Sequence, residues 1–550
     1  MNTLKRLTTS FRRALPPESG FQDQNQDALP GQHPTAARMR DAERDVRWMP
    51  LPASAPPCRW IALLLAVIVL LLPVLTFAQE PDAQLRLNVL FIAVDDLRPE
   101  LGIYGRPVHS PHIDRLARSG TVFEKAYCQQ ALCMPSRASL LTGRRPDTTK
   151  VYAFQRDFRD ALPDVVTLPQ YFKAHGFHTQ AFGKIFHKDD PASWSEALRP
   201  STKARYHTQQ GKDVLRYIKE DFRRIQFTWH LGEGITKTKR MGGLPWEAPA
   251  VEDDALRDGD NTNRAIATLK RLKDKPFFLA VGYHKPHLSF IAPKKYFDLY
   301  DHDRIPLAPN PYPPDDVPQC ALYNWNDMRH YYGVPKVGPV SDAMARNLIH
   351  AYFACVSYID AQVGRLLDAL DALGLKDNTV IILWGDHGWQ LGEHGMWDKH
   401  SNFETSTHVP MILHVPGQTP ARTQALVEFV DIYPTLTELC GLPAPMGVEG
   451  DSFAPLLQNP AHPWKSAAFS QYPRVIPGYG RGMGHSIRTQ HYRFTEWTVE
   501  GTDFKAYELY DHALDPGENV NVVNDPKYAA KVAELRGRLH AGWKKARPIF

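Results

Sequence analysis

Two pairs of adjacent residues, three aspartates and one histidine in all, could bind a metal ion. Asp95-Asp96 and Asp386-His387 each stand at the end of an apolar run of the kind that forms a buried strand. Carboxylate oxygens are hard ligands that suit Ca²⁺, and three carboxylates are present here. By itself, Asp95-Asp96 would fit a helix N-cap or a turn equally well. Because a further aspartate, Asp386, follows a second predicted strand, a metal site is favoured.

A cysteine stands in a second distinctive pattern. Cys133-Met-Pro-Ser-Arg137 is continued by Ala-Ser-Leu-Leu-Thr-Gly143-Arg144. One interpretation is a buried structural cysteine beside a helix that begins with proline. The pattern also resembles the signature of the sulfatase family, in which a maturase oxidises the cysteine to formylglycine. The proline and the arginine are part of what the maturase reads, so the resemblance implies both a modification site and a catalytic site.

The resemblance implies a specific use of residue 133. The hydrated aldehyde of formylglycine carries two hydroxyls on one carbon, and one of them attacks the sulfur of a sulfate ester. The second hydroxyl then loses its proton, and sulfate is expelled as the aldehyde re-forms. A serine in this place would leave an enzyme sulfate ester that hydrolyses slowly.

Sulfate carries negative charge and needs fixed cations around it. The candidates are Arg137, Lys184, His187, His287 and Lys399. In sulfatases the pair that matches Lys184 and His187 binds sulfate and assists deprotonation of the hydrate, so we expect His187 to act as the base. By the same resemblance His287, with Lys399, protonates the leaving oxygen.

The resemblance also completes the metal shell. Asp95, Asp96 and Asp386 would share Ca²⁺ with an oxygen of the hydrate derived from Cys133 and with a sulfate oxygen. Residue 387 is histidine, where many sulfatases have asparagine. The iduronate-2-sulfatases share this histidine, so we expect His387 to belong to the metal site. Among the other polar residues, we expect His284 and Lys285 to support the site and His408 to orient a loop.

Further segments resemble the iduronate-2-sulfatase branch of the family. They are residues 280–287, 384–394, 399–403, 407–410 and 484–489. The resemblance runs from about residue 88 to the C-terminus. It implies an alkaline-phosphatase-like large domain with a small C-terminal sheet domain. It also implies a sulfated oligosaccharide or polysaccharide as substrate, with cleavage at 2-O-sulfated uronic acid residues of heparin-like or dermatan-like chains.

Two departures leave the natural glycan open. Residues 190–262 form an aromatic and basic stretch with little resemblance to the family, and this stretch could line the sugar-binding cleft. His400 follows Lys399 where an aromatic residue is expected. Hydrolysis of a sulfated sugar is therefore a firmer expectation than specificity for iduronate.

The elements that position these residues alternate along the chain. Apolar runs predict strands at residues 88–94, 121–126, 276–282, 378–384 and 411–415. Helical periodicity predicts helices at residues 111–118 and 341–373, each ended by glycine. This alternation predicts an α/β fold with a mixed, mostly parallel sheet sandwiched by helices. In such sheets ligands bind beyond the carboxyl ends of the strands, where Asp95-Asp96 and Asp386-His387 are expected.

The chain of 550 residues is too long for one ordinary core. We expect four parts: a disordered polar lead (1–58), a signal peptide or anchor (59–78), a catalytic domain (85–440) and a C-terminal α+β domain (446–550). The apolar run 60–78 ends in Thr-Phe-Ala, which favours a cleaved signal over a membrane anchor. We therefore expect a periplasmic or secreted protein that contacts the membrane only if the leader is uncleaved. The net charge of +5 includes no basic run typical of nucleic-acid binding.

Two other functions stay open from the sequence. A phosphatase or phosphodiesterase can share this fold, although such enzymes usually use Thr or Ser as nucleophile, often with two zinc ions. A non-catalytic polysaccharide-binding module would tolerate the loss of catalytic groups, whereas every expected group is present. Replacement of Cys133 would separate an enzyme from a binding module, because a module would lose little.

Overall fold

The computed structural model describes residues 86–220, 226–230 and 236–548. All of them belong to one compact unit, residues 81–550. The expected polar lead (1–58) and the expected signal or anchor (59–78) lie outside the described residues. Within the described ranges, no helix combines the length and the apolar character needed to cross a membrane.

Seven strands form the central sheet. In spatial order they are β11 (Ala421–Glu428), β2 (Thr121–Tyr127), β10 (His408–His414), β9 (Thr379–Gly385), β1 (Asn88–Val94), β7 (Phe277–Tyr283) and β3 (His178–Gly183). Every residue of β1, β7 and β9 is buried, as expected for strands that are covered on both faces. All five strands predicted from apolar runs are confirmed.

All strands of this sheet except β10 run in one direction. β1 pairs in parallel with β7 and β9, β3 with β7, and β11 with β2. β10 is antiparallel to both of its neighbours, β2 and β9. The carboxyl ends of the parallel strands therefore meet at one edge of the sheet, which is where ligands bind in α/β folds.

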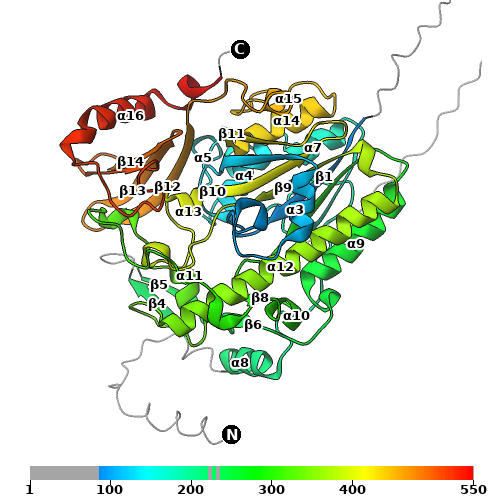
Figure 1. The fold of residues 1–550 in the computed structure, drawn as a ribbon, viewed down its shortest axis with the longest axis horizontal. Coiled ribbons are helices and arrows are strands. Elements are labelled where there is room, and N and C mark those ends of the chain that lie inside the picture. Colours follow the sequence, from blue (N-terminus) through cyan, green and yellow to red (C-terminus); the bar gives the residue numbers. More distant parts are fainter. Residues whose placement is uncertain (1–85, 221–225, 231–235, 549–550) are drawn as a thin grey trace, which may run out of the picture. The chain divides into compact units, whose positions relative to one another are not determined.

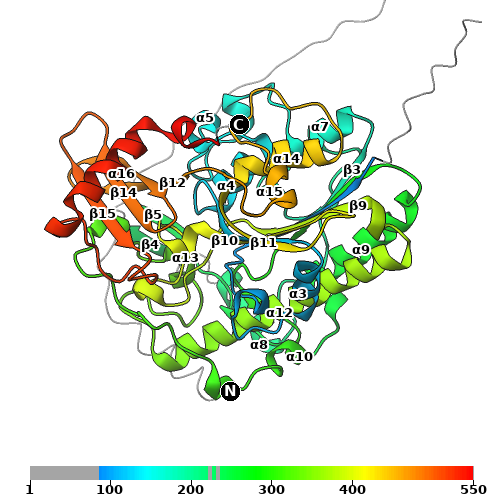
Figure 2. The same ribbon diagram turned by 45° about the horizontal axis from the view of Figure 1, so that its top comes forward.

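Helices cover both faces of the sheet, and Figures 1 and 2 show the two layers. One layer contains α3 (Pro111–Arg118), α9 (Arg257–Leu272) and α12 (Asp342–Ala372). The other contains α4 (Cys133–Thr142), α7 (Leu168–Ala174), α14 (Ile432–Leu439) and α15 (Ala454–Gln458). The helices predicted at 111–118 and 341–373 are confirmed as α3 and α12.

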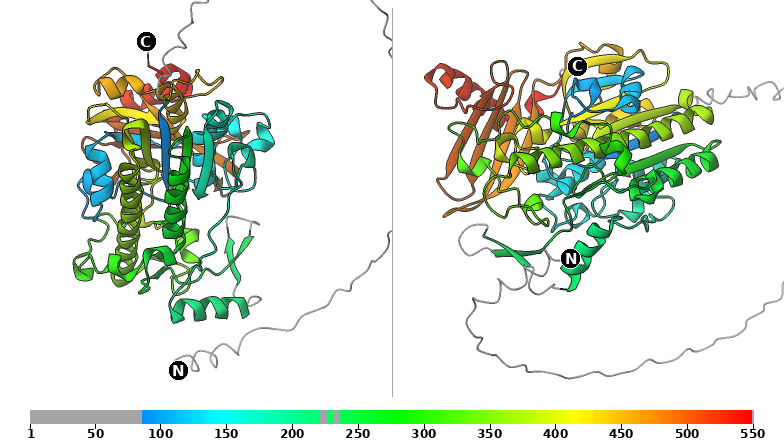
Figure 3. Two further views of the ribbon diagram at one scale, coloured as in Figure 1. Left: turned by 90° about the vertical axis from the view of Figure 1, so that its right-hand side faces the viewer. Right: turned by 60° about the horizontal axis from the view of Figure 1, so that its bottom comes forward.

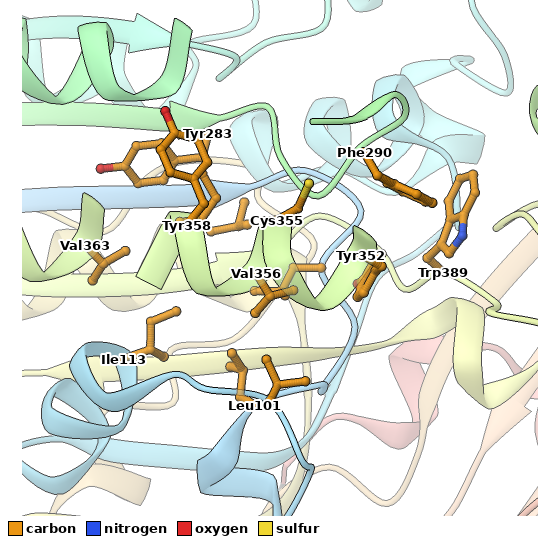
Figure 4. Close-up of a cluster of buried hydrophobic side chains, with 14 of the residues drawn as sticks. Leu101, Ile113, Tyr283, Phe290, Tyr352, Cys355, Val356, Tyr358, Val363 and Trp389 are labelled. Atoms are coloured by element: carbon orange, nitrogen blue, oxygen red, sulfur yellow. The ribbon is translucent and has the colours of Figure 1, made fainter. Parts of the chain in front are cut away.

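The long helix α12 supplies much of the core under the sheet. Figure 4 shows Tyr352, Val356 and Val363 of this helix in one apolar cluster with Leu101 and Ile113. Full burial of one valine, leucine or isoleucine side chain stabilises the folded state by about 1.5–3 kcal/mol. The apolar residues that recur about every 3.6 positions in α12 thus pack this helix against one face of the sheet.

Further helices and strands lie in the connections. The helices are α5 (Pro146–Thr149), α6 (Phe158–Ala161), α8 (Gln209–Glu220), α10 (Lys294–Phe297), α11 (Asn326–Arg329) and α13 (Glu404–Thr407). The strands are β4 (Gln226–His230), β5 (Thr236–Arg240), β6 (Trp246–Glu247) and β8 (Phe290–Ile291).

The C-terminal part forms a second, antiparallel sheet. Its strands are β12 (Ala468–Ile476), β13 (Gly480–Arg488), β14 (Tyr492–Val499) and β15 (Lys505–Asp511), and they pair in sequence order. Leu535 of helix α16 (Ala529–Ala541) is buried in one apolar cluster with residues of this sheet. Figure 3 shows the red helix beside the orange strands. The predicted fold class is confirmed, while the domain boundaries at 440 and 446 remain predictions.

Candidate active site

The carboxyl edge of the large sheet gathers residues from many parts of the chain. β1 is followed by Asp95 and Asp96, β9 by Asp386 and His387, β3 by Lys184, β7 by His287, and β2 by the loop to Cys133 at the start of α4; Lys399 lies in the connection from β9 to β10. Residues more than 250 positions apart in the sequence thus become neighbours.

The three carboxylates form a fully buried cluster. Asp95, Asp96 and Asp386 are each 0% exposed. Asp96 has a φ of 61°, a left-handed conformation that aspartate tolerates better than most residues. In this turn the Asp96 N–H donates to Asp386 Oδ1 at 2.9 Å, which ties the end of β1 to the end of β9.

Arg137 holds two of these carboxylates together from one side. Its Nε donates to Asp386 Oδ2 at 2.8 Å and its Nη2 to Asp95 Oδ1 at 3.1 Å. A third donor, Nη1, bonds the carbonyl of Ile185 at 2.9 Å. The side chain is buried, so the planar guanidinium is locked in place by the full set of its partners.

Cys133 is the first residue of α4, and its thiol points into the acidic cluster. Its Sγ lies 3.2 Å from His387 Nε2 and 4.0 Å from Asp96 Oδ1. Burial and the negative charge of Asp95 raise the pKa of the Cys133 thiol. The thiol therefore stays protonated at neutral pH, and in that form it is a weak nucleophile.

Two lysines balance the remaining negative charge. Lys184 Nζ lies 2.5 Å from Asp95 Oδ2, and Lys399 Nζ lies 2.9 Å from Asp96 Oδ1. Burial would raise the pKa of Asp95, but the charges of Lys184, His287 and Arg137 hold it well below its usual range. For Asp96, burial together with repulsion from neighbouring carboxylates outweighs the attraction of Lys399 and raises the pKa to about 7.

The donor set suits a hard divalent cation. One ligand atom each from Asp95, Cys133, Asp386 and His387 lies within 4.8 Å of the others. A buried carboxylate whose pKa is raised to about 7, like that of Asp96, is one that a proton or a cation stabilises. Asp95, Asp96 and Asp386 offer oxygen donors, which fit Ca²⁺, while His387 adds the nitrogen that the sequence led us to expect.

The histidines lie at different depths around this cluster. One ring nitrogen of His287 lies within 4.8 Å of ligand atoms of Asp95, Asp96 and Cys133. His187 is more exposed and stacks on Phe154 with ring centroids 4.7 Å apart. Partial burial and the positive charge of Lys184 lower the pKa of His187 to about 4, so its imidazole is neutral at neutral pH and able to accept a proton.

His284, Lys285 and His408 were expected to have supporting roles. His284 Nδ1 lies 3.8 Å from Asp95 Oδ2, whereas Lys285 Nζ turns away and bonds the carbonyl of Ser289 at 2.6 Å. His408 lies at the start of β10, where its Nε2 bonds the carbonyl of Glu124 at 2.9 Å.

Three supporting residues escaped the sequence analysis. Ser136 Oγ donates to the Asp386 carbonyl at 2.5 Å, and the ring of Trp389 lies 5.1 Å from Lys399 Nζ. Asp258 accepts the backbone N–H groups of His284 and Lys285, both at 2.9 Å. Ser136 and Trp389 lie inside the recognisable segments, but Asp258 lies in the stretch 190–262, where no motif signals its role.

Comparisons with known proteins identify the family of the chain. The family model "Sulfatase" matches residues 87–442, and "N-sulphoglucosamine sulphohydrolase, C-terminal" matches residues 392–545. Iduronate 2-sulfatase of Homo sapiens is 37% identical over 561 residues, which cover 87% of this chain and 98% of that protein.

Solved structures with the same fold have lower sequence identity. A phosphonate monoester hydrolase from Silicibacter pomeroyi superposes with a TM-score of 0.64 at 22% identity, covering 84% of this chain and 96% of that chain. A structure described as a 2-O GAG sulfatase superposes with a TM-score of 0.62 at 24% identity, covering 84% of this chain and 92% of that chain. At these identities the likeness shows the alkaline-phosphatase-like fold alone. Through the match of its sequence over most of its length, the chain belongs to the sulfatase family, whose members hydrolyse sulfate esters, and it is similar to iduronate 2-sulfatase.

Proposed function

We propose that the protein removes the 2-O-sulfate from uronic acid residues of sulfated glycans, with residue 133 as formylglycine and Ca²⁺ at the acidic cluster. The observation that carries this proposal is the position of the Cys133 thiol, 3.2 Å from His387 Nε2 and 4.0 Å from Asp96 Oδ1. The similarity to iduronate 2-sulfatase supports the choice of sugar.

Residue 133 needs the oxidation because its thiol is protonated and buried. Hydrated formylglycine supplies two hydroxyls on one carbon, one to attack sulfur and one whose proton can be removed. Arg137 and Lys184 fix Asp95 in the acidic cluster into which residue 133 points. A maturase outside this chain must carry out the oxidation, and it would read the segment 133–137.

Asp95, Asp96, Asp386 and His387 would hold Ca²⁺, together with an oxygen on residue 133. Ca²⁺ supplies a centre of positive charge that polarises a sulfate oxygen and orients the ester. Three carboxylates already face three cationic side chains, which are Arg137, Lys184 and Lys399. A divalent cation would therefore leave the site net positive, which complements the charge of a sulfate ester.

Proton transfer is assigned to the two histidines. Neutral His187 accepts a proton from residue 133 in its hydrated form. His287, half-buried beside Asp95 and Asp96, donates a proton to the leaving sugar oxygen. Burial and the positive charge of Lys399 lower the pKa of His287, so the neutral ring donates its N–H and regains a proton from Lys399, whose pKa is raised by Asp96. Arg137 keeps Asp95 and Asp386 in place throughout.

The same proposal includes export of the protein. The run 60–78 would act as a cleaved signal, so that the enzyme meets sulfated oligosaccharides or polysaccharides in the periplasm or outside the cell. Residues 85–440 would form the catalytic domain and residues 446–550 the C-terminal domain.

Hydrolysis of two aryl esters tests the reaction type, because a phosphonate monoester hydrolase shares the fold. We expect enzyme produced with a maturase to cleave an aryl sulfate far faster than the phosphate ester of the same aryl group. Cys133→Ala should lower the rate on the sulfate by about 10³-fold or more. Removal of metal with a chelator should abolish the activity, and Ca²⁺ should restore it.

A nearby buried thiol offers a matched control. Cys128→Ala removes another free, fully buried sulfhydryl just upstream of α4 and should leave the rate within a few-fold of wild type. Preference for the phosphate ester, or full sulfatase activity in Cys133→Ala, would contradict the proposal.

A further inference from the structure

A cavity opens beside the active site, next to the histidines that follow β7. It has a volume of 310 Å³, and His284 and His287 form part of its wall. The same histidines reach the acidic cluster, because His284 Nδ1 is 3.8 Å from Asp95 Oδ2 and a ring nitrogen of His287 is within 4.8 Å of ligand atoms of Asp96 and Cys133. The cavity and the catalytic cluster therefore share one wall.

Arg205 lines this cavity and is held in a fixed orientation. Its Nη2 donates to Ser289 Oγ and to the Tyr331 hydroxyl, both at 3.0 Å. The guanidinium also lies 5.3 Å from the ring of Tyr206 and 5.9 Å from that of Tyr331. Despite these contacts the side chain is exposed, and among the described residues no carboxylate forms an ion pair with it. The guanidinium, whose Nε and Nη1 are not used in these bonds, thus keeps its charge unbalanced at the wall of the cavity.

The other charged groups of the cavity add to this positive character. Arg257 is exposed at the wall, and its Nε donates only to the carbonyl of Lys203, so its charge too is unpaired within the described residues. Lys285 Nζ bonds the carbonyls of His287 and Ser289. Asp258, the one carboxylate among the residues that line the cavity, is 2% exposed and accepts hydrogen bonds from two backbone N–H groups. The cavity therefore presents two unpaired cations and little accessible negative charge.

The rest of the wall suits a sugar ring. Leu256, Ile291 and Tyr331 are buried apolar or aromatic residues that would contact C–H groups. The volume of 310 Å³ is at the small end of the range for ligand pockets, about 300–1,000 Å³. One saccharide unit with a charged substituent fits such a space better than an extended chain.

We propose that the Arg205 cavity binds a second oxyanion of the substrate, namely a carboxylate or a further sulfate on the sugar whose ester is cleaved or on its neighbour. This inference rests on the proposed function, in which His287 protonates the leaving oxygen, since the sugar that carries this oxygen must then lie on the side of His287. Arg205 and Arg257 are available there to bind an anion, and Arg205 acts as the specificity-determining residue through charge-assisted hydrogen bonds from its remaining donors, Nε and Nη1.

Kinetics of Arg205→Gln on matched substrates test the inference. The substrates are an aryl sulfate without a second anion, a 2-O-sulfated uronic acid glycoside, its carboxyl-reduced counterpart, and a neutral hexose glycoside with two sulfates. We expect KM for the uronic acid glycoside to rise about 10- to 100-fold with little change in kcat, because one charged contact is lost. The rate on the aryl sulfate should stay within about twofold.

The substrate that responds identifies the anion. An effect confined to the uronic acid glycoside assigns a carboxylate, and an effect confined to the disulfated hexose assigns a sulfate. Arg304→Gln removes an exposed arginine, 88% accessible, and serves as the control for net charge. Arg205→Lys should recover part of the loss in KM, because it keeps the charge but not the fixed position that Ser289 and Tyr331 give to the guanidinium.

An equal effect of Arg205→Gln on all four substrates, or none on any, would overturn the inference while leaving aryl sulfatase activity intact. Lack of wild-type activity on the aryl sulfate would instead overturn the proposed function, and the inference with it.

Discussion

At the residue scale, Arg137 is the group on which the acidic cluster depends. It touches Asp95 and Asp386, two carboxylates from different strands that are 0% exposed. Buried charges are tolerated only when they are paired, and removal of one partner leaves the others unpaired at a cost of several kcal/mol. The motif thus supplies a structural requirement of the site as well as a signal to the maturase.

Replacement of Arg137 by methionine should destabilise the metal-free protein by about 3–5 kcal/mol. Ca²⁺ should stabilise this variant more than it stabilises wild type, because Asp386 then lacks its cation and Asp95 keeps only Lys184. Thermal unfolding with and without Ca²⁺ measures both effects. Arg115→Met, which removes an exposed pair with Asp368, should cost less than about 1 kcal/mol. Equal stability of the two variants would show that Arg137 does not stabilise the buried carboxylates.

At the element scale, the connection from β9 to β10 carries residues to the site and also anchors itself. Lys399 reaches Asp96, while the next residue, His400, turns into a pocket between the rings of Tyr323 and Tyr472, with centroids 4.6 and 5.8 Å away. The sequence led us to expect an aromatic residue at 400, and the imidazole occupies an aromatic environment in its place. Asp327 and Asp398 lie 3.7 Å from its two ring nitrogens.

Acid should unfold the protein in part through this histidine. Burial, only partly opposed by Asp327, lowers the pKa of His400 to about 3. In the unfolded chain a histidine takes up its proton near pH 6.5, so the folded state loses stability as pH falls from about 6.5 towards 3. Between pH 7 and pH 5, His400→Gln should lose about 2 kcal/mol less stability than wild type. Chemical denaturation at both pH values measures this difference, with His302→Gln as the exposed control. Identical pH dependence in wild type and His400→Gln would refute the assignment.

At the scale of the whole molecule, the sequence predicted which residues meet at the site. It predicted strand direction and the supporting tertiary contacts less well. The strand ends at Asp95 and Asp386 were predictable because apolar runs mark buried strands and parallel strands share an edge. The reversed direction of β10 was not, because a buried strand reads the same in either orientation. Nor could spacing reveal that Asp258 orients the segment 284–285, or that Arg205 faces the cavity, since both contacts are tertiary and lie in a stretch without a motif.

Mass spectrometry of the peptide that contains Cys133, taken from enzyme of measured sulfatase activity, tests the proposed chemistry most directly. We expect an aldehyde in place of the thiol, in a fraction that rises in proportion to specific activity across preparations made with and without a maturase. An intact thiol at residue 133 throughout fully active enzyme would contradict the role of formylglycine.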